Sequence, residues 1–260
     1  QKQCVGTIVG AIDPNLTDPS CAYITDCTAL CYIESKGPTG GIAGNYAQTT
    51  YTAAKWTGKI TGCTVRGKMV LTGAYNQTYA CLGGIVSHVT ETSSFTYNGV
   101  NKVQNSKRGG AVDIADCVVT AELVNNAGSA YFAGGIVGYA KETISQAYLK
   151  INNCRFDGRI SGLGYAGGII GYSEMGANSP TYDVKNCMVT GAVAGGTDIT
   201  GQLIGYHTRS SGTFTMTGNT CVGQYVGSDA ELVGSDNTSL PSLMARAASL
   251  TLSDSLAINF

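Results

Sequence analysis

The chain has little charge and no strong excess of either sign. Only 13% of its 260 residues are Asp, Glu, Lys or Arg, and the formal net charge is −1 at pH 7. Proteins that bind the phosphate backbone of nucleic acids need a basic surface, so this balance argues against that class. No run reaches 18 apolar residues, which excludes a transmembrane helix from the sequence. Because 43% of the residues are hydrophobic, disorder is disfavoured as well.

Signatures of catalysis and of metal binding are also scarce. The chain has two histidines, His88 and His207, and it contains no CxxC, GxSxG or HExxH motif. Zinc sites need four close ligands, and nucleophilic catalysis needs a base beside Ser or Cys. We therefore predict that the chain is not an enzyme and that it has no catalytic residues, no metal site and no cofactor.

Glycine is abundant, with 36 residues, and many of these glycines belong to a repeated string. The copies are GGIAGN (40–45), GGIVSH (83–88), GGIVGY (134–139), GGIIGY (167–172) and GQLIGY (201–206). Their first aliphatic residues are Ile42, Ile85, Ile136, Ile169 and Leu203, and weaker copies place two more markers at Ile8 and Leu232. Most steps between markers are about 34 residues. The two longer steps predict insertions near 64–80 and 91–113.

A repeat of this length cannot bury its apolar side alone, so stacked copies are expected to form a solenoid. Alternation with a period of two predicts strands. Equivalent residues should then form columns about 4.8 Å apart. The aliphatic markers form the interior column. A second column contains Asn45, His88, Tyr139, Tyr172 and Tyr206, and a third contains Cys63, Cys117, Cys154, Cys187 and Cys221.

The strings GGIVGY and NC-x-[FV]-x-G together resemble the GLUG-motif repeats of bacterial secreted and surface proteins. The resemblance covers most of residues 4–235 and is strongest in 117–206. It implies a right-handed parallel β-helix with a surface or adhesive role, and the seven markers predict about seven repeats. It implies no catalytic residues.

The predicted organisation is a repeat region, 1–235, followed by a cap or assembly segment, 236–260. Pro241 and the Ala-rich filling after it predict a short helix at 241–249. A strand-like segment follows at 250–260. The open ends of a solenoid need a cap or a partner, so we expect a homo-oligomer through these ends, with 250–260 adding a strand to a neighbour.

The ten cysteines are interpreted mainly as small buried apolar residues in the column. Cross-rung disulfides within the column stay open. The best candidate for a disulfide is Cys21 with Cys31, in an irregular N-terminal insertion where the repeat does not already fix the chain.

We predict a secreted, extracellular or cell-surface protein that acts in adhesion or as a filament-forming building block. Its partner would be a protein or glycan on a host or neighbouring cell surface. The alternative is a glycan-binding module or polysaccharide-active enzyme on a β-helix scaffold. Loop tyrosines such as Tyr97 and Tyr182 would stack on sugars or a protein partner, or would cover a sheet face. The acids that could catalyse glycan chemistry are Asp113, Asp116, Asp183 and Glu174.

Overall fold

The computed structural model describes residues 4–10, 23–47, 58–73, 80–90, 94–97, 100–103, 111–128, 130–142, 148–176, 181–196, 200–222 and 225–226. All regular structure in these ranges is β-strand, and nearly all strand pairs are parallel. None of these residues belongs to a helix that is long and apolar enough to cross a membrane.

Four stacks of strands run along the molecule, and we name them sheets A to D. The two sheets that flank the glycine corner are A and B. Sheet A contains β1 (Val5–Gly6), β4 (Thr39–Gly40), β8 (Cys81–Gly83), β15 (Phe132–Gly134), β20 (Tyr165–Gly167) and β25 (Thr200–Gly201). Sheet B contains β5 (Tyr46–Ala47), β9 (Val86–Thr90), β16 (Val137–Glu142), β21 (Ile170–Met175) and β26 (Ile204–Arg209).

The other two sheets enclose the rest of the core. Sheet C contains β2 (Tyr23–Thr25), β6 (Gly58–Thr61), β12 (Ala111–Ala115), β17 (Tyr148–Asn152), β22 (Thr181–Lys185) and β27 (Thr213–Thr217). Sheet D contains β3 (Thr28–Ser35), β7 (Thr64–Leu71), β13 (Val118–Val119), β14 (Glu122–Asn125), β18 (Arg155–Phe156), β19 (Arg159–Gly162), β23 (Met188–Val189), β24 (Ala192–Ala194), β28 (Thr220–Cys221) and β29 (Tyr225–Val226).

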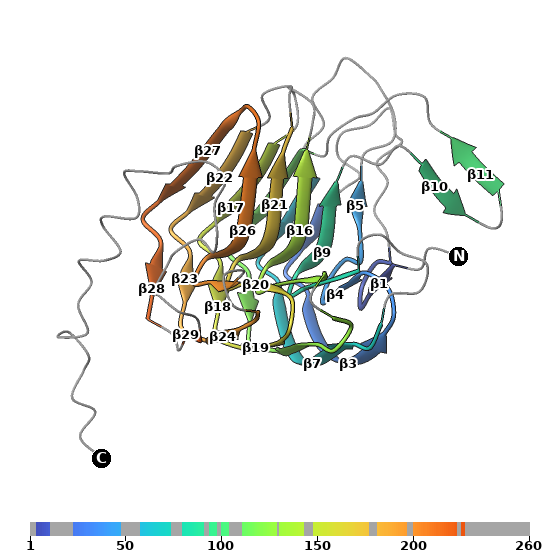
Figure 1. The fold of residues 1–260 in the computed structure, drawn as a ribbon, viewed down its shortest axis with the longest axis horizontal. Coiled ribbons are helices and arrows are strands. Elements are labelled where there is room, and N and C mark those ends of the chain that lie inside the picture. Colours follow the sequence, from blue (N-terminus) through green and yellow to red (C-terminus); the bar gives the residue numbers. More distant parts are fainter. Residues whose placement is uncertain are drawn as a thin grey trace.

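The chain visits the sheets in the order C, D, A, B and then starts the next turn. This path is a β-solenoid of at least four complete turns. Strands β1–β3 lie at one end of the stack and β27–β29 lie at the other (Figure 1). An antiparallel hairpin, β10 (Ser94–Tyr97) with β11 (Val100–Val103), projects from the body of the solenoid.

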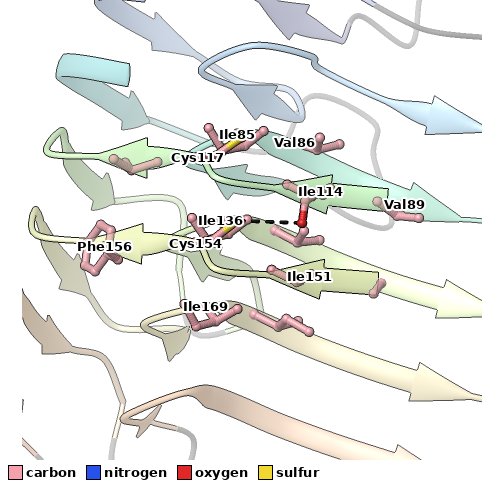
Figure 2. Close-up of a cluster of buried hydrophobic side chains, with 14 of the residues drawn as sticks. Ile85, Val86, Val89, Ile114, Cys117, Ile136, Ile151, Cys154, Phe156 and Ile169 are labelled. Carbon is pink, nitrogen blue, oxygen red and sulfur yellow. Dashed lines mark hydrogen bonds between the residues drawn. The ribbon is translucent and has the colours of Figure 1, made fainter. Parts of the chain in front are cut away.

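The alternation of side chains decides which residues fill the interior. In β17, Leu149 and Ile151 are fully buried, whereas Lys150 and Asn152 between and beyond them are exposed. The same alternation recurs in the neighbouring strands of sheet C, in register. The apolar half of each strand therefore builds one continuous core (Figure 2).

The glycine string forms the tight corner between sheets A and B. A Cβ atom on Gly135 would lie 2.0 Å from the Gly168 carbonyl oxygen and 2.5 Å from Phe156 Cγ. Only glycine fits there, because the neighbouring turn and a core ring already occupy the space. The next residue, Ile136, points into the core and its N–H donates to the Ile169 carbonyl at 3.0 Å.

A second corner, between sheets C and D, depends on left-handed backbone. Asp26, Asp116, Asn153 and Asn186 have φ between 51° and 55°, and Gly62 and Gly218 fill the same place in their turns. Asn, Asp and Gly are the residue types that adopt this conformation at low cost. The left-handed backbone at this corner therefore restricts the residue before each cysteine of the column to Asn, Asp or Gly.

Two parts of the predicted architecture are not supported. Seven repeats are not supported, since sheets A and C each stack six strands and sheet B stacks five in the described part. The marker Leu232 lies outside the described residues, as do the predicted helix at 241–249 and the segment 236–260. The helix has no support, and the fold that is shown is an all-β solenoid.

The predicted insertions can be placed in part. Residues 64–71 of the first one are β7, a regular strand of sheet D that pairs with β3 on one side and with β13 and β14 on the other. The second one, near 91–113, contains the hairpin β10–β11 and the start of β12. Each predicted insertion therefore includes residues that belong to a regular strand of the solenoid, and only the rest of each segment can be extra chain.

Candidate functional site

The predicted interior column is buried throughout. Ile42, Ile85, Ile136, Ile169 and Leu203 are at most 1% exposed. Four backbone hydrogen bonds of 2.8–3.0 Å join successive members of this column, from Ile42 to Leu203. Only the first marker differs: Ile8, at the N-terminal end, is 46% exposed although its N–H still donates to the Ile42 carbonyl. These side chains hold the turns together and present no reactive group.

The cysteine column begins one turn earlier than the sequence predicts. Strand register places Cys27 beside Cys63, and the column continues through Cys117, Cys154 and Cys187. All five are free thiols, and all but Cys27 are buried. Each thiol lies near the carbonyl two residues earlier, as in the 3.2 Å contact from Cys117 Sγ to Ala115 O. From Cys63 on, each also faces a carbonyl of the preceding turn, as Cys154 Sγ faces Ile114 O (Figure 2).

Cys221 does not belong to this column. It pairs with Val189, two positions further along sheet D. Asn219 takes the sixth place instead: its Oδ1 accepts the Cys187 N–H at 2.9 Å and its Nδ2 donates to Val184 O at 2.9 Å. An amide thus replaces the thiol where the column meets the last described turn.

The stacked thiols influence one another. Hydrogen bonds with the thiols of Cys154 and Cys63 lower the pKa of Cys117. The same bonds, with burial, raise the pKa of Cys63 and of Cys154. Each Sγ contacts backbone carbonyls, so the column is a stack of thiols whose pKa values depend on their neighbours rather than a set of independent nucleophiles. Within the described residues, no group of three His, Cys, Asp or Glu side chains is arranged to hold a metal ion.

Of the two cysteines in the candidate disulfide, only Cys31 is among the described residues. Cys31 is a free thiol in β3, and its Sγ lies 3.5 Å from the Arg66 carbonyl oxygen. Burial raises its pKa. Cys21 lies outside the described residues.

The predicted tyrosine column lies on the outer side of sheet B, where it meets sheet A. Ring centroids are 5.1 Å apart for His88 and Tyr139, 5.4 Å for Tyr139 and Tyr172, and 5.1 Å for Tyr172 and Tyr206. Asn45 extends the column and is buried. The rings lie against each other, so much of their area is taken up within the column.

Two rings from sheet A close this column into an aromatic cluster. Phe132 lies 4.9 Å from Tyr139 and 4.7 Å from Tyr172, and Tyr165 lies 5.4 Å from Tyr206. The Tyr139 hydroxyl donates to Glu174 Oε2 at 2.9 Å, and burial raises the pKa of Tyr172. The cluster is a small second hydrophobic core. The sequence feature that could have predicted it is the aromatic residue two positions before the glycine string, Phe132 before Gly134 and Tyr165 before Gly167.

The acids that could have served glycan chemistry are not brought together. Glu174 is on sheet B and forms an ion pair with Lys141 at 2.8 Å. Asp116 occupies the left-handed corner and accepts from Asn153 Nδ2 at 2.6 Å. Asp113 and Asp183 lie on the outer face of sheet C, separated by the strand that carries Lys150.

The outer face of sheet C therefore alternates in charge along the solenoid. Register aligns Lys59, Asp113, Lys150 and Asp183 on successive turns. Burial raises the pKa of Asp113, and the charges of Lys150 and Lys59 oppose that shift. One oxygen of Asp113 and one of Asp183 are inaccessible and accept no hydrogen bond. No ion pair joins these four side chains among the described residues: Asp183 Oδ2 pairs with Lys185 on its own strand at 2.7 Å, and Lys150 Nζ lies over the Tyr148 ring.

The described residues include a Ser–His pair that sequence reasoning did not find. His207 Nδ1 lies 3.0 Å from Ser173 Oγ, and both side chains are fully buried between sheets B and C. The His207 ring stacks on Phe214 at 4.5 Å. A substrate cannot reach this hydroxyl, so the pair is a polar contact in the core. Tyr182, expected in a loop, is also a core residue of β22.

Comparison with models of protein families, with curated proteins and with solved structures found no match for this chain.

Proposed function

We propose that the chain is a non-enzymatic, secreted or cell-surface β-solenoid that acts in adhesion or as a structural building block. The observation that carries this proposal is the continuity of the columns. The Ile, Cys and left-handed columns and the charged column of sheet C run in register from turn to turn. The repeated residues thus hold the turns together, as in a scaffold. The likeness to GLUG-motif repeats supports the same role, and we infer a right-handed winding because parallel crossovers favour that hand.

Adhesion would use the outer faces of the sheets and the partner would be a protein or glycan on a host or neighbouring cell. The aromatic cluster favours this general role over a sugar-stacking platform, since its rings lie against one another. The separation of the described acids favours it over a polysaccharide-active enzyme, which needs two carboxyl groups on either side of one bond.

The test is to locate the protein on intact cells of its source with an antibody and an added protease. Labelling and cleavage without lysis are expected. Labelling that appears only after lysis would overturn the proposal. Beads coated with the folded protein should also bind target cells, and beads coated with the heat-denatured protein serve as the control.

A further inference from the structure

The core is covered less well in the first turn of strands than in the next one. Ile24, Cys27 and Ile33 are only partly buried although they point into the core. Their neighbours in the next turn, Ile60, Cys63 and Met69, are fully buried. The columns are the same, so the difference comes from position alone. Within the described residues, one layer is missing at this end.

Strand β3 forms the edge where such a layer would pair. All eight of its residues pair with β7, and no described strand pairs with its other edge. The carbonyls of Cys27 and Ser35 accept from the N–H of Thr64, which begins β7, and of Thr72, which follows it. Because peptide groups alternate along a strand, those of Leu30 and Tyr32 point away from β7. An edge of this length offers unpaired donors and acceptors to another strand.

The side chains at this end do not protect the edge with charge. Of the seven exposed large hydrophobic residues in the described part, four lie here: Ile8, Tyr23, Leu30 and Tyr32. Leu30 is 81% exposed and Tyr32 is 74% exposed. Glu34 is the only charged residue of β3. Isolated soluble proteins usually place Lys, Pro or a bulge at such an edge.

The sequence contains a segment that fits this edge. In residues 250–260, LTLSDSLAINF, every second position is apolar except Asp254: Leu250, Leu252, Leu256, Ile258 and Phe260. The positions between them are Thr, Ser, Ser, Ala and Asn. This alternation is typical of a strand with one buried face. Its length exceeds the eight residues of β3, and its apolar face would cover the partly buried Ile33.

We propose that residues 250–260 of one copy add a strand to the β3 edge of a second copy. The chain leaves the described solenoid at β29, the end opposite to β3 (Figure 1). In a head-to-tail stack, the end of one copy faces the β3 end of the next, which brings the segment beside that edge. A head-to-tail contact does not close on itself, so it extends into filaments. This inference rests on the proposed structural function and names its partner, a second copy of this chain.

The experiment measures assembly of the full purified chain by sedimentation velocity over a hundredfold range of concentration, with negative-stain electron microscopy. The wild type is expected to grow into end-to-end oligomers. Leu256→Asp places a charge on the apolar face and should raise the dissociation constant at least tenfold. Ser255→Asp places the same charge on the polar face and should assemble as the wild type does.

A variant of the acceptor edge tests the other half of the contact. Leu30→Pro removes an N–H that points away from β7, and it should block assembly while the circular dichroism spectrum stays that of the wild type. Leu30→Val keeps the N–H and should assemble. If Leu30→Pro fails to fold, the pair of variants in 250–260 decides the question.

Two outcomes overturn the inference. One is unchanged assembly of Leu256→Asp. The other is a wild type that stays monomeric at every concentration while residues 250–260 are protected from hydrogen exchange, which would mean that the segment binds its own chain. Neither outcome touches the proposed function, because surface location on intact cells is measured separately. A chain that assembles but is found only inside cells would overturn the function and leave the inference standing.

Discussion

One column offers two identical residues whose surroundings differ only by their place along the solenoid. Ile24 and Ile151 belong to the same inward-facing column of sheet C, which runs through Ile60 and Ile114. Ile151 is fully buried with a turn on either side, whereas Ile24 is partly exposed in the first turn. Replacing each of them with Ala therefore separates the effect of the residue from the effect of its position.

The expected cost follows from what each substitution uncovers. Ile→Ala removes three carbons, worth about 0.8 kcal/mol each when they are fully buried. At Ile151 the cavity that remains is closed by neighbouring turns, so the free energy of unfolding should fall by about 3–4 kcal/mol. At Ile24 part of the side chain already contacts solvent and no closed cavity forms. The cost there should be roughly 1 kcal/mol.

Urea denaturation followed by far-ultraviolet circular dichroism measures both values, at a concentration where sedimentation shows monomers. The slope of the free energy with urea should stay unchanged, which shows that the same surface is exposed on unfolding. Equal costs for Ile24→Ala and Ile151→Ala would refute the reasoning, because the first turn would then be as well covered as the others. A cost below about 1 kcal/mol for Ile151→Ala would refute it as well.

Three further predictions concern single residues. Asn186→Ala should cost about 1–2 kcal/mol in thermal melts because alanine does not tolerate a φ of 53°, whereas Asn186→Gly should be close to neutral. Burial raises the pKa of Cys221 to about 12. Below pH 9 the thiol is neutral in both the folded and the unfolded chain. As pH rises from about 9 to about 12, the unfolded thiol ionises first, so the free energy of unfolding falls over this range. Melts over that range should show a smaller alkaline decline in Cys221→Ala. Burial also raises the pKa of Asp113, which means that its charged form is disfavoured in the fold; Asp113→Asn should raise the melting temperature at pH 7 relative to pH 4, and a rise of the same size at both pH values would contradict this account.

The glycine string determined how much of the fold could be predicted. Its glycines allow a corner that other residues would block, and its period places the aliphatic column. That column needs no knowledge of neighbouring strands, because each copy carries its own corner. The aromatic cluster was harder to foresee, since Phe132 approaches Tyr139 and Tyr172 only after sheets A and B have folded onto each other.

The cysteine column shows where matching letters misled. Aligning the cysteines placed Cys221 in the column and omitted Cys27. The feature that fixes the register is the left-handed residue before each column position, so Asp26 predicts that the next residue, Cys27, belongs to the column. By the same rule Gly218 precedes Asn219, whose Nδ2 donates to the preceding turn at Val184 O, where a column thiol would make its contact.

The length and the ends of the solenoid depend on neighbours rather than on the local sequence. Residues 64–71 were predicted as part of an insertion, yet they form one long strand because β3 offers eight residues to pair with. Ile24 and Ile60 occupy equivalent places, but only Ile60 has a turn on both sides. A repeat therefore encodes the shape of a turn and the columns that join turns, and it does not encode where stacking stops. The open edge of β3 is thus a consequence of its position, and the strand that we propose to cover it comes from residues 250–260, outside the repeat.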